Sequence, residues 1–127
     1  MNLEQEAKQW MKEKQKSMIT AKQYQEGACS TAIYPKHQAM EYLSLGLVGE
    51  AGEIANKVKK FIRDGSAPDE YIQKKIDLAY EVGDVLWYCA VLLDELEMDL
   101  GHIMESNLKK LADRKARGKL HGSGDNR

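Results

Sequence analysis

Two pairs of acidic residues have spacings that suit a metal site built on helices. Glu50 and Glu53 stand three positions apart, as do Glu81 and Asp84, and 27 residues separate the pairs. Residues three apart lie on one face of a helix, so two antiparallel helices would bring four carboxylates to the edge of one core. All-oxygen ligands suit hard ions such as Mg²⁺ or Mn²⁺. Such cations would offset the repulsion among partly buried negative charges.

Two other interpretations of the acidic pairs stay open. A solvated acidic face would show the same three-residue spacing by chance. A di-iron helical bundle is the other, but it usually needs two Glu-x-x-His elements. The nearest approach is Asp99-x-x-His102, which stands alone. The spacing therefore favours a hard divalent ion over iron.

Three glycines surround the first acidic pair. Gly46, Gly49 and Gly52 fall within seven residues, and each glycine inside a helix costs about 1 kcal/mol relative to alanine. The missing side chains leave room for a ligand or for a closely packed helix, and the pattern fits both equally well. It is not a dinucleotide-binding fingerprint, because no strand precedes it and the glycine spacing differs.

Basic and amide side chains flank the acidic pairs. Lys57 and Lys60 continue the acidic face, where ammonium groups reach phosphate oxygens, although Lys57 also stands four residues after Glu53, as in an ordinary helical ion pair. Farther along the chain, the side-chain amide of Asn107 suits a contact to a base or sugar, and the cations of Lys110 and Arg114 suit phosphates. The predicted substrate-binding residues are Lys57, Lys60, Asn107, Lys110 and Arg114.

Helices are the elements that must position these residues. Apolar spacing predicts a first helix over about 3–28, either continuous or broken near Thr20, and a second over about 37–63 after Tyr34-Pro35. A third runs from the turn after Pro68 to about 96, and Asp99 is the expected N-cap of a fourth that ends near Gly118. No segment alternates with a strand period, so the sequence predicts an all-α fold.

Apolar stripes on three of these helices should form the core. The second helix carries Leu43, Leu47, Ile54, Val58 and Phe61; the third carries Leu78, Val82, Val85, Cys89, Leu92 and Leu96; the fourth carries Leu100, Met104, Leu108 and Leu111. The third helix is apolar on a second side too, through Ala79, Leu86, Ala90 and Leu93. A helix that is apolar on most sides needs burial on most sides, which predicts a homo-oligomer.

Length and charge exclude several classes of protein. The 127 residues suit a single domain, and 19 basic against 20 acidic residues give a net charge of −1. We therefore expect neither nucleic acid nor a membrane as a partner. Two cysteines 60 positions apart and the lack of a long apolar run favour a reduced, cytoplasmic chain. The glycine-rich segment 118–127 is either disordered or ordered by a ligand or neighbouring subunit.

The motifs resemble those of the MazG-like nucleoside triphosphate pyrophosphohydrolases, which are all-α. That family carries Glu-x-x-Glu, a variable spacer and Glu-x-x-Asp. The likeness extends to Leu45-Gly46-Leu47, to the Trp87-Tyr88 neighbourhood of the second pair, to segment 107–115 and to the tail 122–127. It covers the chain from about Tyr24 onwards and leaves the first twenty residues unexplained.

This resemblance implies a fold, an activity and a site. The fold is a four-to-five-helix bundle completed by oligomerisation, a homodimer or homotetramer. It would form one domain over 1–127, with an extra helical segment at 1–20 and a tail at 118–127. The implied reaction splits a nucleoside triphosphate between its α and β phosphates, with Mg²⁺, or Mn²⁺ as the alternative, held by catalytic Glu50, Glu53, Glu81 and Asp84. The alternative is a non-catalytic helical module that binds a nucleotide or a protein.

Overall fold

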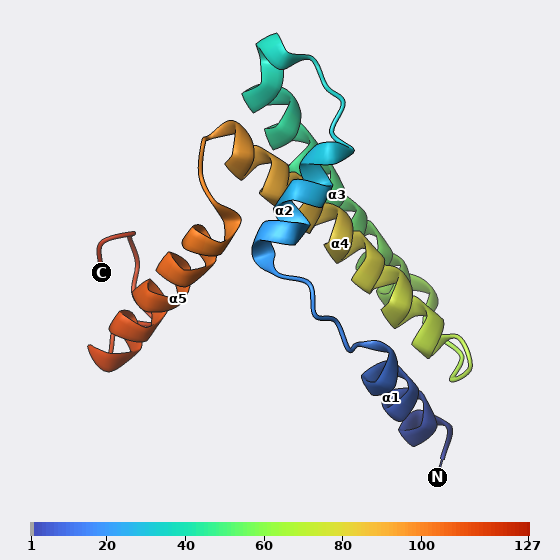
Figure 1. The fold of residues 1–127 in the computed structure, drawn as a ribbon. Coiled ribbons are helices and arrows are strands. Elements are labelled where there is room, and N and C mark those ends of the chain that lie inside the picture. Colours follow the sequence, from blue (N-terminus) through green and yellow to red (C-terminus); the bar gives the residue numbers. More distant parts are fainter. Residues whose placement is uncertain (1) are drawn as a thin grey trace.

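A computed structural model describes residues 2–127, which form five α-helices and one short 3-10 helix and contain no strand. The elements are α1 (Leu3–Lys14), α2 (Ala21–Ser30), η1 (Lys36–Gln38), α3 (Ala39–Asp64), α4 (Tyr71–Glu95) and α5 (Leu100–Ala116) (Figure 1). The predicted all-α class is confirmed for this part of the chain. Met1, the first residue of the predicted domain, lies outside the described residues.

The predicted first helix is two helices, separated by residues 15–20. Each begins with a capping box, in which the first side chain and the side chain three residues later bond to each other's backbone. Thr20 Oγ1 accepts from the Gln23 backbone N–H at 3.1 Å, and Gln23 Oε1 accepts from the Thr20 backbone N–H at 3.0 Å. The break expected near Thr20 is therefore where α2 starts.

The other helix boundaries lie close to those predicted. α3 begins at Ala39 rather than His37, because residues 36–38 form the 3-10 turn that follows Pro35. Asp99 is the N-cap of α5, although its side chain makes no capping hydrogen bond. Gly65 and Gly118 follow α3 and α5 with φ of 68° and 67°, a conformation that glycine adopts without strain.

α3 and α4 form an antiparallel pair that carries most of the packing. They run side by side and are joined by residues 65–70 (Figure 1). Leu43 of α3 packs with Ala90 and Val91 of α4, and Ala28 of α2 completes this small buried cluster. α2 therefore lies across the α3–α4 pair near the chain reversal that follows α4.

Buried Gln25 fixes how α2, α4 and α5 meet. Its amide nitrogen donates to the carbonyls of Ala90 at 3.2 Å and Met98 at 3.0 Å, and its amide oxygen accepts from the Leu100 backbone at 2.9 Å. One side chain thus links a carbonyl of α4, a carbonyl of the connection after α4 and the first backbone N–H of α5. From there α5 runs away from the α3–α4 pair (Figure 1).

The predicted buried face of α4 is partly wrong. Val82 and Leu96, assigned to the core stripe, are 46% and 44% exposed, whereas Ala90 and Val91 are fully buried. The reason is α2, which packs on α4 on the side that carries Ala90. On α3, Val58 is likewise 40% exposed, while Leu43 is buried as predicted.

Large apolar side chains remain exposed on several helices. On the three longest helices they include Leu45, Val48 and Ile62 of α3, Tyr80 and Leu86 of α4, and Met104, Leu108 and Leu111 of α5. The stripe predicted for the fourth helix is thus mostly on the surface of the single chain. Oligomerisation, which would cover such side chains, stays a prediction.

α1 lies beside the first half of α4. Leu3 shares a surface hollow with Tyr71 and Ile72 of α4, and Met11 shares another with Ile76. None of the helices in residues 2–127 combines the length and the apolar character needed to cross a bilayer. Both cysteines of this described part, Cys29 and Cys89, are free thiols.

Gly46 provides a test of the α3–α4 contact. A β-carbon at Gly46 would clash with the Tyr88 ring, whereas one at Gly52 would meet nothing within 4 Å. We expect Gly46→Ala to lower the free energy of unfolding by about 1–3 kcal/mol through overpacking. Gly52→Ala, the control on the same helix, should instead raise it by up to about 1 kcal/mol.

Urea unfolding followed by circular dichroism measures both variants. Combining Gly46→Ala with Tyr88→Leu should recover part of the loss, since the smaller side chain makes room for the added methyl group. Equal stability changes for Gly46→Ala and Gly52→Ala would contradict a close approach of Tyr88 to α3.

Candidate metal centre

Three of the four predicted acidic residues meet between α3 and α4. Glu50 of α3 and Glu81 and Asp84 of α4 each offer a carboxylate oxygen, and these oxygens all lie within 4.8 Å of one another. Glu50 and Glu81 are half-buried, and Asp84 is exposed. We call these three residues the acidic cluster. Helical spacing and an antiparallel pair are sufficient to bring them together, as the sequence predicts.

Glu53, the fourth predicted acid, lies outside the acidic cluster and is exposed. Three positions along a helix turn the side chain about 60° round the axis from its starting direction. Glu50 therefore faces α4, while Glu53 lies farther toward solvent on the same side of α3. The two acids of the first pair thus have different environments.

The acidic cluster affects the ionisation of Glu50. The pKa of this carboxyl is raised above its usual value, first by burial and then by the negative charge of its neighbours. In order of effect, these neighbours are Asp84, Glu81 and Glu53. The ionised form of Glu50 is therefore disfavoured in the folded chain, and a bound cation would offset its negative charge.

The donor set fits a hard divalent cation. The acidic cluster offers only carboxylate oxygens, with no histidine or cysteine among the grouped ligand atoms. Such donors suit Mg²⁺ or Mn²⁺ rather than softer ions. Gly49 and Gly52 have no atoms within 4 Å of where a β-carbon would stand, so the surface beside the cluster is open. Gly46, by contrast, is explained by helix packing against Tyr88.

Two tyrosines that the sequence analysis did not single out adjoin the acidic cluster. Tyr24 of α2 donates to the Gly83 carbonyl at 3.5 Å. Burial raises the pKa of both the Tyr24 and Tyr88 hydroxyls, and the nearby charge of Asp84 adds to the shift in each. Tyr88 stands four residues after Asp84, so helical spacing places it on the cluster's face. Nothing in the sequence points to Tyr24, which comes from a separate helix.

The two predicted lysines of α3 differ in their surroundings. Lys57 Nζ lies 3.3 Å from Glu81 Oε1, so this lysine pairs with α4 rather than with Glu53 four residues before it. Lys60 is exposed. One lysine therefore touches the acidic cluster, and the other stands farther along the helix.

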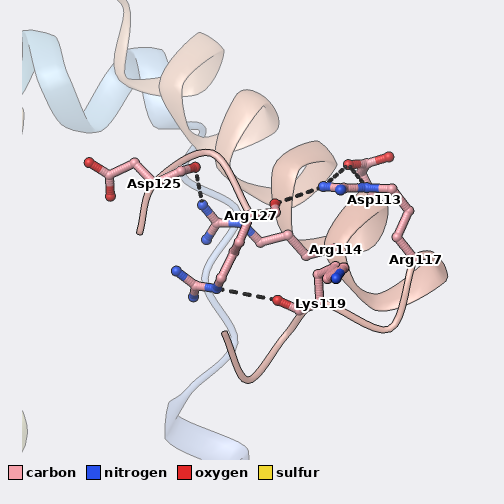
Figure 2. Close-up of polar contacts among 6 residues, drawn as sticks. All are labelled: Asp113, Arg114, Arg117, Lys119, Asp125 and Arg127. Atoms are coloured by element: carbon pink, nitrogen blue, oxygen red, sulfur yellow. Dashed lines mark hydrogen bonds and ion pairs between the residues drawn. The ribbon is translucent and has the colours of Figure 1, made fainter. Parts of the chain in front are cut away.

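The predicted residues of α5 lie away from the acidic cluster of the same chain. Asn107 and Lys110 are exposed on α5, the helix that diverges from α3 and α4 (Figure 1). Arg114 is only 6% exposed, and its guanidinium donates to the Asp125 carbonyl at 2.6 Å (Figure 2). The arginine predicted to meet phosphate is thus covered by residues 118–127.

Arginine side chains donate to backbone carbonyls of this tail. Arg117 donates to the Arg127 carbonyl at 2.8 Å, and Arg127 donates in turn to the Lys119 carbonyl at 3.3 Å (Figure 2). Arg127 also donates to the Gly124 carbonyl at 2.7 Å. The donors of these hydrogen bonds are guanidinium groups of the same chain. The two states expected for this segment, disordered or ordered by a ligand or a neighbouring subunit, stay predictions.

The raised pKa of Glu50 predicts how stability depends on pH. A carboxyl whose pKa is higher in the folded chain binds more protons when folded, so stability falls as the pH rises through that pKa. Glu50→Gln removes the charge. It should raise the thermal midpoint in EDTA at about pH 7, and the gain should disappear near about pH 4, where Glu50 itself is largely protonated.

Glu41→Gln is the matched control, because it removes one exposed negative charge from the same helix outside the acidic cluster. Differential scanning calorimetry at both pH values measures the effect. A Glu50→Gln midpoint no higher than that of Glu41→Gln at neutral pH would contradict the repulsion within the cluster.

Comparison with known proteins agrees with this geometry. The family model described as the MazG nucleotide pyrophosphohydrolase domain matches residues 38–118, which hold both acidic pairs. The Gene 37 protein of Mycobacterium phage L5 is 47% identical over 110 residues, which cover 82% of this chain and 96% of the relative. No solved structure is a significant match. The chain therefore belongs to the MazG nucleotide pyrophosphohydrolase family.

Proposed function

We propose that this protein hydrolyses a nucleoside triphosphate between the α and β phosphates, with Mg²⁺ as the working cation and Mn²⁺ as a substitute. Water adds across that phosphoanhydride, and the products are a nucleoside monophosphate and pyrophosphate. The observation that carries the proposal is the acidic cluster, whose three carboxylate oxygens lie within 4.8 Å of one another. The helices that carry them, α3 and α4, lie within residues 38–118, which the family model matches.

The four acids divide the work in this proposal. Glu50, Glu81 and Asp84 hold the cation, which would neutralise charge on the phosphates and lower the pKa of bound water. Glu53 would orient the attacking water and take its proton. Its exposure and its position outside the acidic cluster support that role, because it is not enclosed with the other three. No nucleophilic serine, cysteine or histidine is required.

The remaining predicted residues would bind the substrate. Lys57 and Lys60 of α3 and Lys110 and Arg114 of α5 supply cations for phosphate oxygens, and the amide of Asn107 supplies contacts to base or sugar. For Arg114 this role requires residues 118–127 to move, since its guanidinium is bonded to Asp125.

Pyrophosphate release tests the reaction. Across a panel of nucleoside triphosphates, we expect release from at least one member when Mg²⁺ is present and none when EDTA replaces it. Glu53→Gln should lower turnover about 100-fold or more, since several kcal/mol of transition-state stabilisation correspond to at least two powers of ten in rate.

Glu41→Gln should keep wild-type turnover, because that exposed residue stands in the first turn of α3, more than two helical turns before Glu50. Full turnover by Glu53→Gln would exclude the proposed role of that residue. Nucleotide binding without hydrolysis across the whole panel would favour a non-catalytic binding module instead.

We also propose that the site is completed in a homodimer or homotetramer. The divergence of α5 from the α3–α4 pair supports an arrangement in which Asn107 and Lys110 serve the acidic cluster of a neighbouring copy (Figure 1). The uncovered apolar side chains of α4 and α5, among them Leu86 and Leu108, support a contact between copies.

Complementation tests a shared site. Glu53→Gln and Lys110→Met should each be inactive alone, and their mixture should recover about a quarter of wild-type turnover, because half of randomly mixed dimers contain one intact site of two. Sedimentation checks that each variant assembles. A mixture no more active than its components would place both residues in the site of one chain.

A further inference from the structure

Lys57 is the cation that touches the acidic cluster. Its Nζ lies 3.3 Å from Glu81 Oε1, and the two side chains are 34% and 19% exposed. Within residues 2–127, no other ion pair involves Glu50, Glu53, Glu81 or Asp84. The only direct ionic compensation that the described chain gives these acids therefore comes from this one ammonium group.

Lys57 pairs with Glu81 although a second acid, Glu53, lies at ion-pair spacing on its own helix. Glu53 stands four residues earlier on α3, at the spacing of an ordinary helical ion pair, and its carboxylate is exposed. Lys57 instead reaches across to α4 and pairs with half-buried Glu81. An ammonium group is attracted most strongly where several negative charges lie close together in partly desolvated surroundings. Lys57 thus pairs with the acidic cluster on α4 and not with Glu53, its partner by helical spacing.

An ammonium and a divalent cation compete for this position. Mg²⁺ would bind carboxylate oxygens at about 2.0–2.1 Å, and Glu81 Oε1 is the oxygen that Lys57 contacts. One oxygen of each of the three carboxylates lies within 4.8 Å of the others, so an ammonium group and a metal ion bound to these residues would be close together. Like charges so close together repel one another by an amount that depends on solvent access. Binding of the metal should therefore expel Lys57 from Glu81.

We propose that Lys57 is an internal counter-cation of the acidic cluster, which holds the three carboxylates together without metal and is displaced from Glu81 when a divalent ion binds. This inference rests on the proposed metal site. Lysine suits the role because its charge sits at the end of a flexible four-carbon stem. After displacement, the ammonium stays within reach of the phosphates that arrive with the metal. Lys57 is thus a positioning residue for the metal-free state and a phosphate ligand afterwards.

Metal binding without nucleotide tests this role. We would titrate the full chain with Mn²⁺ and follow the free ion by electron paramagnetic resonance. Lys57→Met removes the competing charge and keeps the length of the stem, so it should bind Mn²⁺ about three- to tenfold more tightly than the wild type. Lys59→Met is the matched control. It removes one positive charge from the same helix, and Lys59 pairs with Asn56 rather than with an acid, so its affinity should stay within about twofold of wild type.

Thermal unfolding gives a second readout. In EDTA, Lys57→Met should unfold at a lower temperature than the wild type or Lys59→Met, because its cluster has lost its counter-cation. Mn²⁺ should then raise its midpoint by more than it raises that of the wild type. Lys57→Gln is also neutral and keeps a hydrogen-bond donor for Glu81, so it makes the same comparison if Lys57→Met does not fold.

The outcomes separate this inference from the proposed function. Equal or weaker Mn²⁺ binding by both neutral variants, with wild-type binding intact, would overturn the counter-cation role and leave the metal site standing. No Mn²⁺ binding by any of the proteins would overturn both. Tighter binding by the neutral Lys57 variants alone supports the inference, even if pyrophosphate release fails for every substrate in the panel.

Discussion

Repulsion among the carboxylates of Glu50, Glu81 and Asp84 is the constraint on which the rest of this structure depends. Holding these oxygens within 4.8 Å of one another costs free energy in a half-buried place, and the raised pKa of Glu50 reflects that cost. The α3–α4 pair must supply enough packing to keep the acids together. A site that is unfavourable by itself and favourable with a bound cation is the arrangement that a metal-dependent hydrolase requires.

The packing that opposes this repulsion is small. Leu43 and Val91 are the largest fully buried side chains, and Ala28 and Ala90 complete the cluster around them. Direct polar contacts supplement it, above all the three hydrogen bonds of Gln25. Close contact between Tyr88 and Gly46 brings α3 and α4 near enough for the acids to meet. Little apolar surface is therefore buried inside one chain, and large apolar side chains of α4 and α5 stay exposed.

Sequence alone predicted the helices and the acidic cluster because both depend on local rules. Helical period places Glu81 beside Asp84, and an antiparallel pair brings Glu50 to them. The partner of Lys57, the exposed position of Glu53 and the approach of Tyr24 depend instead on how each helix turns about its axis and which helix packs where. Periodicity leaves that rotation undetermined, so the buried face of α4 was mispredicted at Val82 and Leu96.

Arg114 shows why a helix face does not define a ligand contact. Its spacing from Asn107 and Lys110 predicts that the three residues share a flank of the helix. Residues 118–127 nevertheless fold back, and the Arg114 guanidinium donates to the Asp125 carbonyl. An arginine in the last turn of a helix lies near backbone carbonyls that lack helical partners. A tail with several glycines can turn back to meet it. The guanidinium that the spacing assigns to a phosphate is thus already bonded to the Asp125 carbonyl, a contact that helix periodicity does not reveal.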